Sequence, residues 1–266
     1  RGLGDVYKRQ PCLQLFRALN LCYPGGDGGC WNLTKKPSRR ENSFHETSSE
    51  NPEDMSDLRG RIEEVLPLVS KPARYLGNEL NVIRKNHSLM KTKLVLAFPD
   101  VYEIGQSYTG FHILYHVVNR RPDVVAERTF APWPDMERLM RQKAIPLFSL
   151  ESATPLRDFD ALGFTLQHEL NYTNVLNMLD MAGIPLWAKQ RGEQDPLVLG
   201  GGPCAFNPEP LADFFDAFVI GDGEEVIGEI IDSLETTKGA GRPERLKQLA
   251  AIEGAVSYTH LRAHET

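Results

Sequence analysis

The strongest constraint on the fold is an alternation of short apolar runs with helical patterns along the middle of the chain. The first run, residues 94–98, ends at a Pro-Asp pair and leads into a stretch whose apolar residues recur at helical spacing. Further strands are expected in VVAERTFAPW, DALGFTLQ, PLVLGG and AFVIG. Strands without polar alternation that alternate with helices are typical of a parallel sheet covered on both faces. We therefore predict an α/β, doubly wound, Rossmann-like fold with a mostly parallel five-stranded sheet and helices on both faces.

The two ends of the chain differ from this patterned region. Residues 11–54 show no sustained period of 2 or 3.6 and are dense in Gly, Ser, Asn and Pro. The strings GDVYKRQ and VSYTHLRAHET, near the two termini, resemble translated sequencing-adapter DNA, so Met55 is the expected start of the native protein. The expected organisation is a disordered or non-native leader (1–54), a helical or linker segment (55–90), the α/β domain (91–240), the start of a linker (241–255) and an artefact-like tail (256–266).

Charge and hydropathy exclude several classes of partner. The formal net charge is −6, from 30 Lys and Arg against 36 Asp and Glu, so the chain has no general field that attracts a phosphate backbone. No apolar run approaches the roughly 18 residues that span a bilayer, and Arg17 interrupts the early apolar stretch. We therefore expect a soluble, cytoplasmic protein without a direct nucleic-acid or membrane partner.

Candidate binding residues lie where the predicted strands end. In an open parallel sheet, ligands bind outside the carboxyl ends of the strands, at the point where the strand order reverses. Three loops occupy such positions, at residues 100–105, 200–203 and 221–225, and Thr165 lies near the end of the third strand. Their glycines let backbone approach a ligand closely, although strand-to-helix turns also favour Gly, Pro and Asp for conformational reasons.

Other polar residues are expected to be structural. His112 and His116 are four residues apart on a predicted helix, but no third ligand accompanies them, so we predict no metal site. The acidic residues of the last loop complement a helix dipole. Cys204 is the one cysteine in the patterned region, and we expect it to be a small buried filler rather than a nucleophile. No catalytic residue is predicted in this chain.

The ordered strings LVLAFPDVYEIG, LGFTLQ, LVLGGGP and AFVIGDGEE resemble the cobalamin-binding domain that precedes the catalytic barrel in many radical SAM enzymes. Strings such as KPARYLGNELN, ERTFAPWPDME and GGGPCAFNPEP are similar to a bacterial subgroup of these proteins. The resemblance aligns residues 100–105 with the family's D-x-H-x-x-G motif, with Tyr102 in place of the histidine. The cofactor-binding residues that it implies are Asp100, Tyr102, Gly105, Thr165, Gly201, Gly202, Gly221, Gly223 and Glu224.

The resemblance implies cobalamin as the cofactor of this module. A phenol with a pKa near 10 is a poor cobalt ligand at neutral pH, so histidine-type coordination is not expected from Tyr102. The family's 4Fe-4S cluster needs a C-x-x-x-C-x-x-C run, which this chain lacks. The cluster, S-adenosylmethionine and the radical SAM barrel are therefore expected in a downstream domain of the same polypeptide, and this fragment is expected to be inactive alone.

Two other interpretations remain open from the sequence. The first is a degenerate docking domain that has lost the cofactor, which the Tyr102 substitution favours. The second is a Rossmann-type nucleotide-binding enzyme, although Gly105 is not part of a G-x-G-x-x-G turn.

Overall fold

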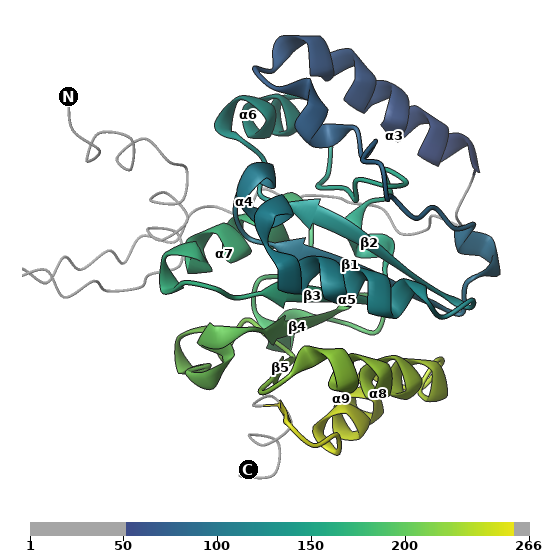
Figure 1. Ribbon diagram of the computed structural model, residues 1–266, viewed down its shortest axis with the longest axis vertical. Coiled ribbons are helices and arrows are strands. Elements are labelled where there is room, and N and C mark those ends of the chain that lie inside the picture. Colours follow the sequence, from purple (N-terminus) through teal and green to yellow (C-terminus); the bar gives the residue numbers. More distant parts are fainter. Residues whose placement is uncertain (1–51, 258–266) are drawn as a thin grey trace, which may run out of the picture. The chain divides into compact units, whose positions relative to one another are not determined.

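The computed structural model describes residues 52–257, and their side chains from Leu58 onward. Our expectations for residues 1–51 and 258–266, which include nearly all of the leader and most of the artefact-like tail, lie outside the described residues. Within residues 52–257 the chain forms strands and helices in the alternating order that the sequence predicts (Figure 1).

The strands are β1 (Thr92–Phe98), β2 (Val124–Phe130), β3 (Ala161–Thr165), β4 (Leu197–Gly201), β5 (Ala217–Val219) and β6 (Ala255–Val256). In the described part of the chain they form one six-stranded sheet in the order β2-β1-β3-β4-β5-β6. Strands β1 to β5 are parallel, which confirms the predicted doubly wound α/β class. The short strand β6, which we did not predict, pairs antiparallel with β5. The strand order reverses between β1 and β3.

The α-helices are α3 (Pro52–Val65), α4 (Tyr102–Ser107), α5 (Thr109–Asn119), α6 (Pro134–Gln142), α7 (Tyr172–Met181), α8 (Gly223–Thr236) and α9 (Arg242–Ala250). Pro134 occupies the first position of α6, where its fixed φ suits a helix start, and Gly183 follows α7 with a φ of 68°. None of the helices in the described residues is long and apolar enough to cross a membrane. Short 3₁₀ turns connect the elements at Leu66–Leu68, Pro72–Tyr75, His87–Leu89, Leu156–Asp158, Glu169–Asn171, Ala188–Gln190, Pro203–Phe206 and Glu209–Leu211.

Side chains on both faces of the sheet are buried. Alternate residues of a strand point to opposite faces. In β1, Leu94 and Leu96 belong to a buried cluster that also contains side chains of α5, α8 and α9. Val95 and Ala97 point to the other face and are also buried. Figure 1 shows α5 and α8 on the face turned toward the viewer, which is the face that carries the site described below.

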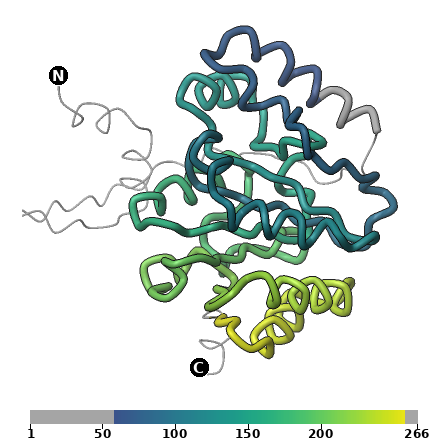
Figure 2. Tube along the Cα trace, in the orientation of Figure 1, coloured from purple at the N-terminus to yellow at the C-terminus, as the bar shows by residue number. Residues whose placement is uncertain are grey.

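The segment between α3 and β1 passes the outer edge of the sheet at β2 (Figure 2). The Lys85 ammonium donates hydrogen bonds of 2.6 to 2.9 Å to three backbone carbonyls where α5 ends and β2 begins. The backbone N–H of Ile83 donates to the Tyr115 hydroxyl in α5 at 2.8 Å. We call residues 71–90 the strap, because these contacts hold them along α5 and β2.

Residues 241–255, where we expected a linker to begin, instead hold α9 and the first residue of β6. Leu246 and Leu249 of α9 are buried in the same cluster as α5 and α8. The Ser257 hydroxyl donates to the backbone carbonyl of Asp216 at 2.8 Å. The apolar stripe of α9 is short and most of its residues are polar, so periodicity alone did not distinguish it from a linker.

Candidate functional site

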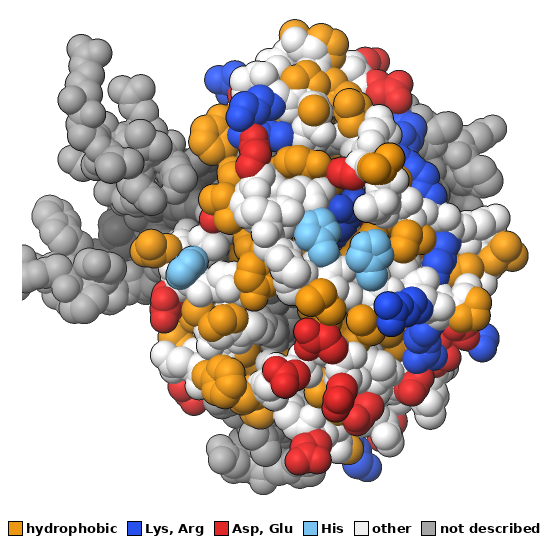
Figure 3. Space-filling view, viewed as in Figure 1, with side chains coloured by type: hydrophobic (Ala, Val, Ile, Leu, Met, Phe, Trp, Pro, Cys, Tyr) orange, Lys and Arg blue, Asp and Glu red, His pale blue; other side chains and the backbone are white. Residues whose placement is uncertain are grey.

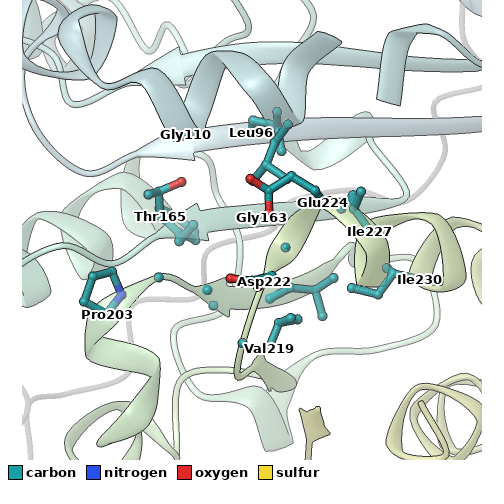
Figure 4. A pocket seen from close by; sticks show the side chains of 18 of the residues that line it. Leu96, Gly110, Gly163, Thr165, Pro203, Val219, Asp222, Glu224, Ile227 and Ile230 are labelled. Carbon is teal, nitrogen blue, oxygen red and sulfur yellow. The ribbon is translucent and has the colours of Figure 1, made fainter. Parts of the chain in front are cut away.

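A cavity of about 470 Å³ opens between α5 and α8 over the sheet. Its volume is in the range of roughly 300–1,000 Å³ that is typical of small-molecule sites. The cavity lies above β1, β3 and β4, beside the point where the strand order reverses, which is the usual ligand position in open α/β sheets. Figure 4 shows side chains from several elements around it. Its lining includes Leu94, Leu96, Tyr108, Gly110, Leu114, Gly163, Phe164, Thr165, Gln167, Leu199, Gly200, Gly201, Gly202, Pro203, Phe206, Val219, Gly221, Asp222, Gly223, Glu224, Ile227 and Ile230.

Gly163 forms part of the floor of this cavity. It is the middle residue of β3, which has a neighbouring strand on each side, yet it remains partly exposed to solvent. A Cβ atom here would lie 3.6 Å from a side-chain carbon of Leu96, an ordinary contact, so the surrounding structure does not exclude a side chain. Our sequence analysis missed this residue. The available signal was a glycine inside a strand pattern, which often marks a close approach by a ligand or another backbone.

The structure brings Thr165, Gly201 and Gly202 together at the ends of β3 and β4, where all three line the cavity. Thr165 and Gly201 are register partners. A Cβ atom at Gly201 would meet no atom within 4 Å, so this position opens onto free space. Gly202 has a φ of 96°, and a Cβ there would lie 3.0 Å from the carbonyl oxygen of Leu166. Backbone geometry thus requires glycine at 202, whereas the fold permits a side chain at 201.

The turn that leads into α8 lies at the same cavity. Gly221, Gly223 and Glu224, which the sequence singled out, line it together with Asp222. Figure 4 shows the side chains of Thr165, Asp222 and Glu224 around this opening, and Figure 3 shows acidic side chains gathered over the part of this face where α8 lies. Among the described residues that line the cavity, none is Lys, Arg or His. The charge at this site therefore disfavours a strongly anionic ligand.

Gln167 is a polar residue of the cavity that sequence reasoning did not identify. Its side-chain nitrogen Nε2 is buried and has no hydrogen-bond partner among the described residues. Most buried side-chain polar atoms in proteins have a partner from the protein or from ordered water. The amide of Gln167 is therefore a donor that is available to a group inside the cavity.

Asp100, Tyr102 and Gly105, which were expected to share the site, do not line the cavity. Gly105 is buried in α4, where a Cβ atom would lie 2.2 Å from a ring carbon of Phe130. Glycine is thus required here for packing between the helix and the sheet. The Asp100 carboxylate accepts the N–H of Val101 at 2.7 Å, a local contact in the turn after β1.

Tyr102 belongs to a partly buried ionic network that joins the strap to β2. Its hydroxyl donates to Glu79 at 2.7 Å, and burial together with the Glu79 carboxylate raises the pKa of Tyr102 to about 12. Arg128 of β2 donates to Glu79 at 3.0 Å and to Glu151 at 2.6 Å. Burial raises the pKa of Glu151 to about 7, outweighing the attraction to Arg128. At neutral pH Tyr102 is therefore a protonated phenol engaged with the strap.

The remaining candidates have local partners. A ring nitrogen of His112 lies 2.8 Å from the carbonyl oxygen of Gln106. Within the described residues, no group of three His, Cys, Asp or Glu side chains is arranged to hold a metal ion. Cys204 is buried next to Tyr172, and burial raises the pKa of its thiol.

Comparison with known proteins places this domain in a family. Residues 110–257 match the family described as radical SAM proteins, N-terminal, a match that covers more than half of the chain and starts after the loop at residues 100–105. An uncharacterized protein of Methanocaldococcus jannaschii is 23% identical over 146 residues, or 54% of this chain. The chain spans 27% of the length of that protein. The chain therefore belongs to the family of N-terminal domains of radical SAM proteins.

Proposed function

We propose that this domain binds cobalamin, with the nucleotide tail of the cofactor in the cavity between α5 and α8, as a module of a radical SAM protein. The observation that carries the proposal is an apolar slot that reaches a mid-strand glycine, Gly163, near the carboxyl ends of parallel strands. A flat heterocyclic base requires such a slot, and the strand-order reversal is where this sheet class binds ligands.

The residues of the cavity fit this group. Gly163 and Gly201 leave open the space that a larger side chain would fill, so a base and its ribose can approach the sheet. Thr165 adds a hydroxyl for hydrogen bonding at the same strand ends. Cobalamin carries a single phosphodiester, so its tail brings less negative charge than a nucleoside diphosphate or triphosphate. The described lining has carboxylates and no cation, and it accommodates such a tail best where the base and ribose enter the cavity and the phosphodiester stays at its solvent-exposed mouth.

Tyr102 does not fit the role of a cobalt ligand. Its hydroxyl is engaged with Glu79, and a pKa of about 12 keeps it protonated at neutral pH. We therefore expect bound cobalamin to have no ligand from this loop, with affinity coming from the cavity. When bound, cobalamin supplies a cobalt centre that can carry a methyl group, and the residues of this chain hold and orient its tail.

Each segment that follows one of the strands β1 to β4 exposes a large apolar side chain. These side chains are Ile104, Trp133, Leu170 and Phe206, of which Leu170 is 83% exposed. Exposed apolar side chains gathered at one edge are typical of an interaction surface. We propose that this edge contacts a radical SAM barrel of the same polypeptide, which would hold the 4Fe-4S cluster and S-adenosylmethionine. The greater length of the archaeal relative is consistent with a further domain.

The same exposed edge would serve a docking domain that binds no cofactor, so this is the second candidate function. A nucleotide-binding enzyme has less support. Among the described residues, the cavity lining has no Lys, Arg or His to pair with the phosphates of a nucleoside diphosphate or triphosphate. It has two carboxylates, Asp222 and Glu224, which would repel them. Gly105 is buried against Phe130 rather than open to a phosphate.

Equilibrium dialysis of hydroxocobalamin against the full chain tests the proposal. The wild type should bind, and Gly201→Val should bind at least about tenfold more weakly because its side chain enters the cavity. Gly228→Ala is the matched control, since a Cβ there also meets no atom within 4 Å but the residue does not line the cavity. Circular dichroism establishes that all three proteins fold. Equal binding by wild type and Gly201→Val places the cofactor elsewhere, and no binding by the wild type supports the docking function instead.

A further inference from the structure

The unpartnered amide of Gln167 indicates a contact that the proposed function does not yet include. Four buried side-chain atoms lack a partner in the described residues, and they belong to Gln167, Asp216, Ser233 and Arg242. Of these, the Nε2 atom of Gln167 is the one whose residue lines the cavity. An unmade hydrogen bond at a buried donor costs free energy, which a bound acceptor can recover.

The backbone that leads into Gln167 is fixed by two hydrogen bonds of Leu166. The N–H of Leu166 donates to the carbonyl of Gly201 at 2.7 Å, and the carbonyl of Leu166 accepts the N–H of Cys204 at 3.1 Å. A Cβ atom at Gly202 would lie 3.3 Å from Nε2 of Gln167, so glycine at 202 also leaves room for this amide. The main chain that carries this donor is thus anchored beside the cavity.

The surroundings of the amide define the acceptor that it can take. Asp222 and Glu224 lie in the same lining, which contains no Lys, Arg or His among the described residues. A phosphate group would meet two carboxylates and no counter-charge, whereas an uncharged ring nitrogen, carbonyl or hydroxyl oxygen needs only the N–H donor. We propose that Gln167 is a ligand-binding residue whose Nε2–H donates to an uncharged acceptor on the base or ribose of the nucleotide tail. The identity of that tail rests on the proposed function, whereas the donor and its site do not.

The test compares wild type, Gln167→Leu and Gln190→Leu in the full chain. Leucine keeps the approximate bulk of the side chain and removes the donor, while Gln190 is an exposed glutamine outside the cavity. Gln167→Leu should bind hydroxocobalamin about tenfold more weakly than wild type, and Gln190→Leu should bind equally well. The thermal unfolding midpoint of Gln167→Leu should equal or exceed that of wild type, because an unsatisfied buried donor is removed. A purely structural role for Gln167 would instead lower the midpoint.

Two further probes separate this inference from the proposed function. Cobinamide, a corrinoid without the nucleotide, should bind wild type and Gln167→Leu with equal affinity. If Gln167→Leu weakens the binding of cobinamide as much as that of cobalamin, the contact with the tail is refuted. Unchanged cobalamin binding by Gln167→Leu would overturn the role of Gln167 while cobalamin binding stands. If wild type binds adenosine but not cobalamin, and Gln167→Leu weakens adenosine binding, the inference holds and the cobalamin proposal fails. If wild type binds neither molecule, both are refuted.

Discussion

Replacing Glu151 by Gln should make the domain more stable at alkaline pH. Glu151 is fully buried, and its carboxylate accepts hydrogen bonds from the backbone N–H of Arg128 at 2.8 Å and from the guanidinium Nε at 2.6 Å. That guanidinium is shared with Glu79, and Glu127 adds a like charge nearby. Burial is the largest influence and raises the pKa of Glu151 from 4.5 to about 7.

The sign and size of the effect follow from proton linkage. Between pH 4.5 and about 7 the folded protein holds a proton at Glu151 that the unfolded chain releases. The stability due to this proton is complete below pH 4.5 and is lost as the pH rises through 7. At about 1.4 kcal/mol per pH unit, the loss is roughly 3 kcal/mol. Glutamine mimics the protonated carboxyl, so Glu151→Gln should unfold like wild type near pH 4.5 and be about 3 kcal/mol more stable near pH 8.

Urea denaturation of both proteins at pH steps from 4.5 to 8 measures this difference. Because all other titrating groups are shared, the difference between the two profiles isolates Glu151. The reasoning would be refuted if the free energies of unfolding of the two proteins changed with pH in the same way, or if Glu151→Gln were less stable than wild type at pH 8. Either result would show that the ion pair with Arg128 outweighs burial.

Three further substitutions test the packing and the ionic contacts. Tyr102→Phe removes the hydroxyl that donates to Glu79, so the free energy of unfolding should fall by about 0.5–1.5 kcal/mol in urea titrations. Its cobalamin affinity should not change, and a large loss of affinity would place Tyr102 in the site. Gly105→Ala puts a methyl group 2.2 Å from the Phe130 ring and should cost about 1–3 kcal/mol in thermal denaturation, whereas an unchanged midpoint would contradict this packing. Asp216→Asn replaces a buried carboxylate that accepts hydrogen bonds from two guanidinium groups at 2.7 and 2.9 Å. Because both guanidinium groups lose their counter-charge, the free energy of unfolding in guanidinium chloride titrations should fall by about 3–5 kcal/mol. Wild-type stability of that variant would be incompatible with the ionic contacts described.

The strand-end residues illustrate what can be predicted from the sequence. Thr165 and Gly201 were expected to lie together because parallel strands bring their carboxyl ends to one edge, and they are register partners. The same reasoning placed Glu224 at this edge, and it lines the same cavity. These predictions depend on strand direction alone, which the alternating pattern indicates well.

Other features depend on contacts between residues that are far apart in the sequence. Tyr102 follows β1 as expected, but its environment is set by Glu79, 23 positions earlier, and no local pattern shows that contact. Gln167 has an ordinary position after a strand, and only the packing around it leaves its amide without a partner. The role of Gly163 could have been predicted from the sequence. Glycine weakens the interior of a strand, and its presence there often marks a close approach by a ligand or another backbone.

The ion pairs on β2 also bear on how the folded domain behaves in concentrated solution. An edge strand with free backbone groups can pair with the edge of another molecule and seed aggregation, and inward-pointing charges are one way in which proteins prevent this. β2 lies at an end of the described sheet, and two consecutive residues at its centre, Glu127 and Arg128, are charged and buried. The strap supplies one partner of each: a ring nitrogen of His87 lies 2.7 Å from the Glu127 carboxylate, and Glu79 pairs with Arg128. The Asn119 side chain and Leu150 already occupy the outward backbone groups of Ala126 and Arg128, and the strap occupies the carbonyl of Val124. A variant that loses the strap would free that carbonyl and leave both buried charges with fewer partners at the sheet edge, so it should precipitate or form oligomers at concentrations where the intact domain stays monodisperse.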